Sequence, residues 1–305
     1  MASASWLGST TWVQQLADAT GMPLLPGSID TMLWSMVLFY ATYAHLAELA
    51  STLVLGRKRW DSFSPATQKE WRMRTTNLLK GLIIGVYATY LVVAGVGGRS
   101  DRTELVDRMF RRDVAVERLG GFSVGFYVWH LGVLMQNFAN EGVGNVAHHI
   151  LVSTCMMSIY RPFLAHHLPC FLAYEVTNIP HNFYRMSKIL GHARMATFHS
   201  AAWIVLFFLF RILYGTLASI AISQDFVQLW KQQQELLLPE TKAWTAAQLA
   251  LVEDQTLMIR PIPYWVIVWC LACTVFLASL NFTWFYKIAR STGARLCGKR
   301  KATTP

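Results

Sequence analysis

The sequence predicts an all-α protein that crosses a membrane several times. Of its 305 residues, 54% are hydrophobic and only 14% are charged, whereas soluble domains carry about 25% charged residues. The mean hydropathy is +0.33. Lys and Arg gather in short bursts between long apolar stretches, as they do in the loops of membrane proteins. The apolar stretches are too long and too continuous for transmembrane strands, which favours helices.

Seven apolar segments are long enough for a helical bilayer span, which takes about 20 residues. They are Ile29–Leu55, Asn77–Gly97, Gly120–Ala139, Val146–Leu164, Pro169–Tyr184, Ala196–Ile222 and Pro261–Tyr286. We therefore expect a helical membrane domain over 71–290. It follows a tail (1–28) and a first span with a basic loop (29–70), and it precedes a basic C-terminal tail (291–305).

Two segments outside the spans have an apolar side. A long extramembrane insertion is expected at about 223–260, where Pro239 and Thr241 mark a helix start that fits an interfacial helix. The N-terminal tail predicts either a short interfacial helix or a segment that orders only when bound. Its apolar residues are Trp6, Leu7, Trp12, Val13 and Leu16.

Loop charges indicate the orientation in the membrane. The loops after the first, third and fifth predicted spans, at 56–76, 140–145 and 185–195, and the C-terminal tail carry more uncompensated Lys and Arg than the other loops. Because positive loops stay on the cytosolic or matrix side, we expect the C-terminus there and the N-terminus on the far side. The expected location is the endoplasmic reticulum or the mitochondrial inner membrane, as an integral protein.

A net charge of +10 does not indicate a nucleic-acid-binding protein, because no basic stripe is interleaved with aromatic residues on a soluble face. The basic bursts at 57–59 and 299–301 flank apolar stretches, which fits contact with anionic lipid headgroups. Four of the five cysteines fall inside apolar segments and are expected only to pack.

Nine histidines raise the question of a metal site. The HxxxH and HxxHH boxes of di-iron lipid desaturases do not occur, and no carboxylate and histidine spacing is typical of zinc. A haem between His130 and another span has no sequence motif. We therefore expect neither a metal nor a cofactor. A further pair, His166 and His167, precedes a proline at a span junction and is expected to be hydrated at the interface.

Polar side chains within the predicted spans are the candidates for function, since an ionised group in mid-bilayer costs a few kcal/mol. The loop charges place several of them in the half of the membrane nearer the C-terminal side, with Glu175 near the middle and Arg211 further toward the opposite face. A similar depth on different helices predicts one polar cavity that binds a lipid. The candidates are Lys80, His130, His148, His149, Glu175, Arg211 and Asn281.

The pair His148 and His149 admits two interpretations. Adjacent helix positions point about 100° apart, so one imidazole can face a cavity while the other contacts a neighbouring helix. A neutral imidazole facing a cavity can act as a general base or as an acyl acceptor. The alternative is hydrogen bonding between helices, and the pair taken alone favours this structural role. Arg211 has two interpretations as well: it neutralises Glu175 in an ion pair that locks the bundle, or it holds the phosphate or carboxylate of a headgroup.

The order of these residues resembles the TLC domain, which ceramide synthases share with translocon-associated membrane proteins and lipid-regulatory proteins. The resemblance covers about Trp71 to Arg290. It lies in Glu70-Trp71-Arg72 with Asn77-Leu78-Leu79-Lys80-Gly81-Leu82-Ile83, Gly125-Phe126-Tyr127-Val128-Trp129-His130, Ala147-His148-His149-Ile150, Glu175-Val176-Thr177-Asn178-Ile179, Phe207-Phe208-Leu209-Phe210-Arg211-Ile212 and Asn281-Phe282-Thr283-Trp284-Phe285-Tyr286-Lys287.

Several positions depart from that family's pattern. Lys80 stands where the first helix commonly has a histidine, and His130 stands where the third commonly has an aspartate. No acidic stretch follows His149, although one does in ceramide synthases. The resemblance therefore implies a lipid-accepting bundle rather than a functioning ceramide synthase.

Three functions follow from these observations, with membrane lipids as the expected partners and no nucleic acid. First, the chain binds a lipid or acyl chain within its helix bundle. The alternative is a structural accessory subunit of a larger membrane complex, such as an energy-transducing organellar complex, since the 12 tryptophans suit contacts with other subunits as well as headgroups. The third is an acyltransferase that uses acyl-CoA as substrate, with His148 or His149 as the base or acyl acceptor.

Overall fold

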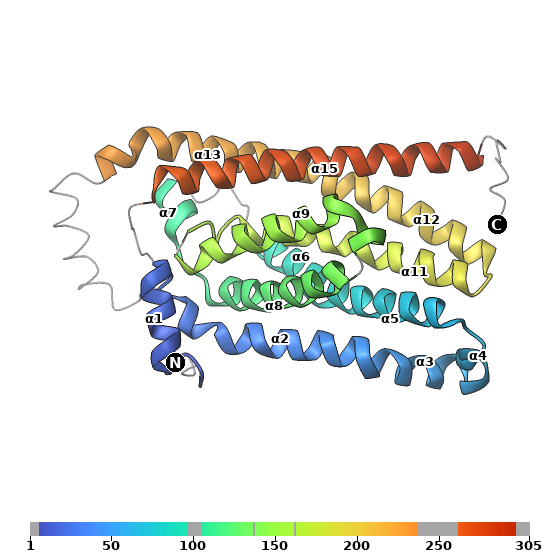
Figure 1. The fold of residues 1–305 in the computed structure, drawn as a ribbon. Coiled ribbons are helices and arrows are strands. Elements are labelled where there is room, and N and C mark those ends of the chain that lie inside the picture. The colour runs from blue at the N-terminus through green and yellow to red at the C-terminus, as the bar shows by residue number, and fades with distance from the viewer. Residues whose placement is uncertain (1–5, 97–104, 137, 162, 237–261, 297–305) are drawn as a thin grey trace.

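The computed structural model describes residues 6–96, 105–136, 138–161, 163–236 and 262–296, and within them it contains helices and turns but no β-strand (Figure 1). The longer α-helices are α1 (Thr11–Thr20), α2 (Ile29–Ala41), α3 (Ala47–Leu55), α5 (Pro65–Lys80), α6 (Val86–Val93), α8 (Val114–Gln136), α9 (Phe138–Met157), α11 (Asn178–Ile189), α12 (Ala193–Phe207), α13 (Gly215–Leu236) and α15 (Tyr264–Leu296). Short helices α4 (Arg57–Asp61), α7 (Leu105–Phe110) and α10 (Leu168–Leu172) lie between them.

Four helical stretches are long and apolar enough to cross a membrane, namely Ile29–Leu55, Pro65–Val93, Ala193–Gln232 and Tyr264–Arg290. The all-helical fold class is therefore confirmed, while the count of seven spans is not. The fifth predicted span is wrong as a single helix. It consists of α10, the 3-10 segment η5 (Ala173–Thr177) and α11. Pro169 and Pro180 both lie in first turns of helices, where the missing N–H of proline is tolerated, so the chain restarts there.

The first part of the expected insertion at 223–260 is helical. Helix α13 continues from the sixth predicted span to Leu236, and the predicted helix start at Pro239 falls outside the described residues. In the N-terminal tail, α1 forms as one of the two alternatives predicted and ends at Gly21, whose φ of 64° suits glycine. It buries Val13 and Ala17 and lies across the end of the bundle (Figure 1).

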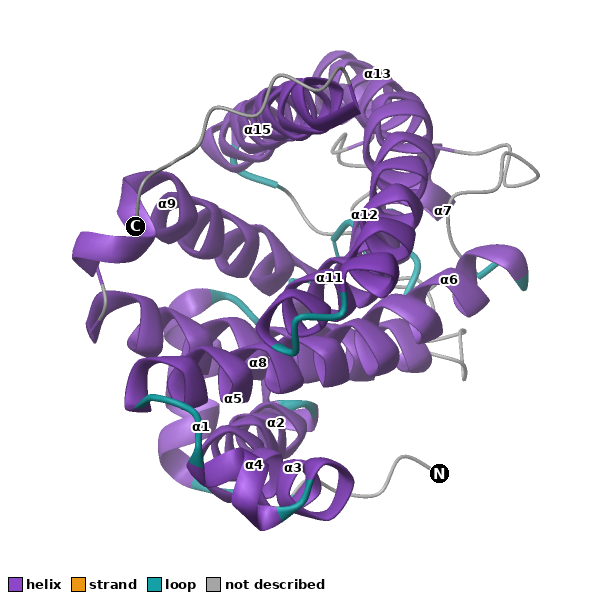
Figure 2. Cartoon of the chain, turned by 90° about the vertical axis from the view of Figure 1, so that its right-hand side faces the viewer, coloured by secondary structure: helices purple, strands orange, loops and turns teal. Residues whose placement is uncertain are grey.

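Seen end-on, α13 and α15 lie on one side of the bundle, α2 to α4 lie on the opposite side, and α5, α8, α9 and α11 lie between them (Figure 2). Helix α2 packs along α8 at very short range. A Cβ atom on Gly125 would lie 2.2 Å from the carbonyl oxygen of Met32, and the hydroxyl of Ser35 donates to the carbonyl of Phe122 at 2.5 Å. Small residues thus bring two membrane helices together.

Three of the four long stretches contain a π-helical segment. These segments are η2 (Thr42–Leu46), η3 (Gly81–Gly85) and η6 (Phe208–Tyr214). A π segment inserts extra residues into an α-helix and occurs frequently at functional sites. Two of the three, η3 and η6, contact η5 in the interior, where most of the predicted polar residues meet.

Candidate functional site

Glu175 on η5 is the centre of a charged layer inside the bundle. Its side chain accepts hydrogen bonds from the Tyr127 hydroxyl at 2.8 Å and the Asn178 amide at 2.5 Å. The Lys80 ammonium lies 2.5 Å from one carboxylate oxygen, and the Arg211 guanidinium lies 3.7 Å from the other. All three charged side chains are buried. One carboxylate therefore faces two cations in the interior.

Two glycines bring Lys80 to Glu175. Lys80 is the last residue of α5, and the π segment η3 begins at Gly81. A Cβ atom on Gly81 would lie 3.2 Å from the carbonyl oxygen of Glu175, and one on Gly85 would lie 2.4 Å from the backbone nitrogen of Val176. At Gly85 only glycine allows this approach of two backbones, and at Gly81 any side chain would push its neighbours back by a few tenths of an ångström. Both positions therefore favour the short distance between the lysine and the carboxylate.

Arg211 joins the last two long helices to the same layer. Its Nε donates to the hydroxyl of Thr177 at 3.0 Å, and its Nη1 donates to the amide oxygen of Asn281 at 3.2 Å. The loop charges had placed Arg211 nearer the opposite face, but its long side chain reaches the layer. Neither of these two partners carries a charge, so among the described residues Glu175 is the group that neutralises the guanidinium.

Three histidines flank the layer, and two of them hold each other. His149 Nδ1 lies 2.8 Å from the carbonyl oxygen of Asn145, which can only accept, so this nitrogen carries the hydrogen. In a neutral ring its Nε2 then accepts from His130 Nδ1 at 2.7 Å. Both nitrogens of His149 are thus engaged in bonds within the bundle.

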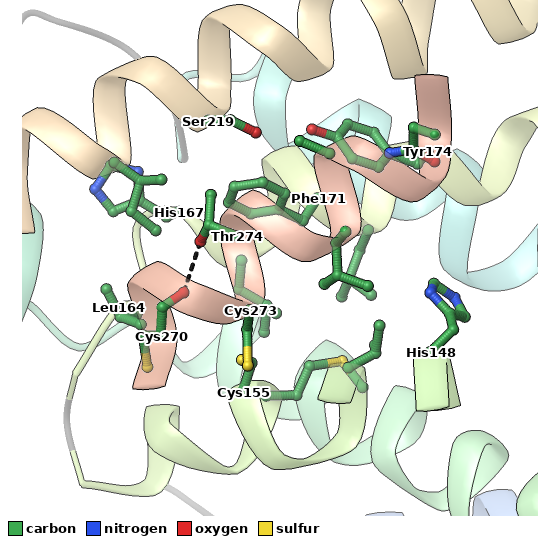
Figure 3. A pocket seen from close by; sticks show the side chains of 18 of the residues that line it. His148, Cys155, Leu164, His167, Phe171, Tyr174, Ser219, Cys270, Cys273 and Thr274 are labelled. Atoms are coloured by element: carbon green, nitrogen blue, oxygen red, sulfur yellow. Dashed lines mark hydrogen bonds between the residues drawn. The ribbon is translucent and has the colours of Figure 1, made fainter. Parts of the chain in front are cut away.

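His148 has a different environment. Its Nδ1 is buried and meets no hydrogen-bond partner in the part of the chain that the structure describes. The ring contacts Trp284 edge to face at 5.4 Å and lines two cavities. Of the two adjacent imidazoles, His148 lines both cavities, whereas His149 lines only the polar one; Figure 3 shows His148 at the apolar cavity.

Two cavities meet at the charged layer and share Tyr127, His148, Glu175 and Arg211 in their walls. On one side is a polar cavity of about 340 Å³, whose walls also include Lys287 and Trp284. On the other side is a mainly apolar cavity of about 110 Å³ (Figure 3). Its apolar walls come from Val152, Met156, Leu168, Phe171, Phe226 and Leu277.

The structure brings the seven predicted polar residues together. Six of them line the polar cavity, and Asn281 lines the apolar one. Sequence reasoning missed Tyr127, Thr177 and Asn178 as partners of the layer. Tyr127 lies one turn before His130 on α8, and the other two follow Glu175 by two and three residues, so helical spacing was the available signal. The described residues contain no group of three or more His, Cys, Asp and Glu side chains that could hold a metal ion.

A second buried ionic network lies at the far end of the apolar cavity. Asp225 on α13 accepts hydrogen bonds from Nε and Nη2 of Arg108 on α7, at 3.1 and 2.8 Å, and its other oxygen lies 3.0 Å from His167 Nε2. The neighbouring carboxylate raises the pKa of Arg108. The prediction of a hydrated interfacial pair at His166 and His167 is wrong, because both side chains are buried under α7 and α13.

Comparison with known proteins agrees with this order of residues. Residues 70–290 match the family model of the TLC domain. An uncharacterised TLC domain-containing protein of Schizosaccharomyces pombe is 21% identical over 296 residues, which cover 96% of this chain and 88% of the relative. No solved structure matches the chain.

Proposed function

Because this chain belongs to the TLC-domain family, we propose that it binds a membrane lipid with an anionic headgroup, and that the charged layer holds the headgroup end. The observation that carries this proposal is the excess of positive charge where the two cavities meet. Glu175 neutralises only one of the two buried cations, Lys80 and Arg211. A phosphate or carboxylate between them completes the charge balance and accepts charge-assisted hydrogen bonds.

The apolar cavity suits an extended hydrocarbon chain. Along α15 its lining runs from Asn281, in the charged layer, to Cys270. At a rise of about 1.5 Å per residue this distance is roughly 16 Å. A methylene group adds roughly 1.25 Å to the length of an extended chain with C–C bonds of about 1.5 Å. The wall is therefore as long as an extended chain of about 13 methylene groups. An acyl chain with its polar end at the layer fits this shape.

Binding of oleoyl lysophosphatidic acid, which has one acyl chain and one phosphate, tests the proposal. Purified protein in detergent micelles is expected to bind it more tightly than monoolein, which has the same chain without the phosphate. The Arg211→Gln variant is expected to lose about 10- to 100-fold in affinity, because a charge-assisted hydrogen bond contributes about 1.5–3 kcal/mol. Arg185→Gln is the matched control, since Arg185 pairs with Glu70 away from the layer. Equal binding by all three proteins contradicts the proposal.

A second function, acyl transfer from acyl-CoA, is favoured by one observation, the buried and unpartnered Nδ1 of His148. In this reaction His148 takes the proton of an attacking amine or alcohol. The nucleophile forms an ester or amide bond with the acyl carbon, and the thiolate of coenzyme A leaves. His149 is a positioning residue, because both of its nitrogens are engaged.

Transfer of a radiolabelled oleoyl group from oleoyl-CoA to a long-chain amine tests this second function. His148→Ala is expected to lower turnover about 10²- to 10⁴-fold, the range of a general base. His192→Ala is the control, since His192 lies in the turn before α12 and lines neither cavity. Turnover that is unchanged in His148→Ala, or in the double variant with His149→Ala, removes this function and leaves lipid binding intact.

A further inference from the structure

A groove runs along the outer face of the bundle between α13 and α15. It has a volume of about 630 Å³ and lies within two of the stretches that are apolar enough to cross a membrane. Val227 on α13 and Val275 and Phe282 on α15 line it, and each is about half exposed. The groove therefore opens toward the region that bilayer lipids occupy around a spanning helix.

Hydroxyl groups along the groove do not make it polar. Ser223 donates to the carbonyl of Ser219 at 2.7 Å, Thr274 donates to that of Cys270 at 2.8 Å, and Ser279 donates to that of Val275 at 2.8 Å. These bonds within the helices satisfy the hydroxyls and direct them away from the groove. Gln224, Gln228 and Lys231 line the part of the groove toward the C-terminus of α13, and the rest of the wall is mainly carbon, which suits an alkyl chain.

Three small residues separate this groove from the apolar cavity. Ser219, Thr274 and Ala278 belong to the walls of both, and all three are partly buried. Figure 3 shows Ser219 on α13 and Thr274 on α15, at the wall of the cavity. Because small side chains form this junction, little has to move for the two spaces to become one.

The two spaces differ in size and adjoin each other at one place. The cavity has a volume of about 110 Å³ and the groove one of about 630 Å³. The cavity wall along α15 is long enough for about 13 methylene groups. An acyl chain that begins at the charged layer and is longer than this wall has the groove as its nearest further space, across the junction at Ser219, Thr274 and Ala278.

We propose that the groove and the cavity form one site for an acyl chain of a bilayer lipid, which passes sideways between α13 and α15 at Ser219, Thr274 and Ala278. This inference rests on the proposed lipid binding at the charged layer. The chain begins in the cavity, crosses the junction and ends in the groove, in contact with the bilayer. The site then accepts chains longer than the cavity itself can hold.

Filling the junction tests this inference with two probes that differ only in chain length, hexanoyl and oleoyl lysophosphatidic acid. In the Ala278→Trp variant we expect oleoyl affinity to fall about tenfold or more, equivalent to about 1.4 kcal/mol, and hexanoyl affinity to stay within about twofold of the wild type. The short chain stays on the cavity side of the junction. Ser219→Leu adds less bulk at the same place and is expected to act in the same direction.

Leu217→Trp is the matched control, because Leu217 is exposed on α13 and lines neither the groove nor the cavity. Thermal unfolding of each variant separates misfolding from blocked binding. Unchanged oleoyl binding in both folded junction variants overturns the lateral site and leaves the proposed function standing. If the wild type binds neither chain length, both proposals fail. An equal loss of both probes in folded junction variants also overturns the inference, since the junction would then serve the headgroup end.

Discussion

Replacing Glu175 by Gln preserves the shape of the side chain but removes the charge that two buried cations share. Gln retains an oxygen that can accept from the Tyr127 hydroxyl, which lies 2.8 Å away. It offers no charge to Lys80, at 2.5 Å, or to Arg211, at 3.7 Å. The variant therefore leaves two cations in the interior, with no carboxylate between them, in a medium that solvates them poorly.

The magnitude follows from the burial of the partners. Glu175 is 4% exposed, Lys80 7% and Arg211 8%. Removing one partner of such a pair costs about 3–5 kcal/mol. For a chain of this size 1 kcal/mol changes the midpoint of thermal unfolding by about 2–4 °C, so Glu175→Gln is expected to lower it by roughly 6–20 °C.

Glu70→Gln provides a matched control with the same change of side chain. Glu70 also lies between two cations, Arg74 at 3.4 Å and Arg185 at 2.5 Å. Its side chain, however, is 32% exposed, and pairs with access to solvent contribute about 0–1 kcal/mol. We therefore expect Glu70→Gln to lower the unfolding midpoint by no more than about 4 °C.

Thermal unfolding in mild detergent, followed by tryptophan fluorescence, measures both variants against the wild type. Adding Lys80→Met to Glu175→Gln is expected to recover part of the lost stability, because one stranded cation is replaced by an apolar side chain. Equal midpoints for Glu175→Gln and Glu70→Gln would refute the reasoning. They would show that the charged layer is as well solvated as the surface of the protein.

Two further predictions concern positions outside the charged layer itself, and both are measured by the same unfolding assay. Gly85→Ala is expected to lower the free energy of unfolding by about 1–3 kcal/mol through overpacking, since the new Cβ would lie 2.4 Å from a backbone nitrogen. Gly132→Ala, at a position with open space around it, is expected to leave the free energy of unfolding unchanged or to raise it by up to about 1 kcal/mol. Equal effects of the two substitutions contradict the close approach at Gly85. Asp225→Asn is expected to lower the free energy of unfolding by about 1.5–3 kcal/mol, because Arg108 and His167 lose their shared carboxylate. An unchanged midpoint of thermal unfolding would show that this network does not hold α7 in place.

Much of the charged layer was predictable from the sequence because charge within an apolar stretch is costly wherever it occurs. That cost alone selected Lys80, Glu175 and Arg211, and it predicted that they point inward. It did not say which cation lies closer to the carboxylate. The distances depend on η3 and η6, and π segments leave no clear mark in a pattern of apolar residues.

The network around Asp225 could not be predicted in the same way. Asp225 follows the predicted sixth span by three residues, so it was assigned to the extramembrane insertion. Arg108 lies in a loop of mixed charge, and His167 follows the predicted fourth span. Each of the three is ordinary in its own segment. Only the continuation of α13 to Leu236 and the packing of α7 against it bring them together.

The fifth predicted span shows the limit of apolar composition as a signal. Residues 169–184 were predicted as a membrane span, yet they form α10, η5 and part of α11 within the interior. Because other helices of the bundle cover them, their composition reflects burial in protein as much as contact with lipid. The 3-10 segment η5 has about 3.0 residues per turn instead of 3.6, so Glu175, Thr177 and the start of α11 point in other directions than they would on a continuous α-helix.

An ion pair that serves only to lock a bundle is balanced, with one anion for each cation, because any surplus charge in the interior costs stability. The layer around Glu175 is not balanced. Thr177 and Asn281 satisfy the hydrogen bonds of Arg211 without neutralising its charge, and Lys80 already contacts the carboxylate. At an effective dielectric constant of about 20, two opposite charges about 4 Å apart attract each other by about 4 kcal/mol, before the cost of desolvation. Under the proposed function an anionic headgroup supplies the missing negative charge, so such a ligand is expected to raise the midpoint of thermal unfolding.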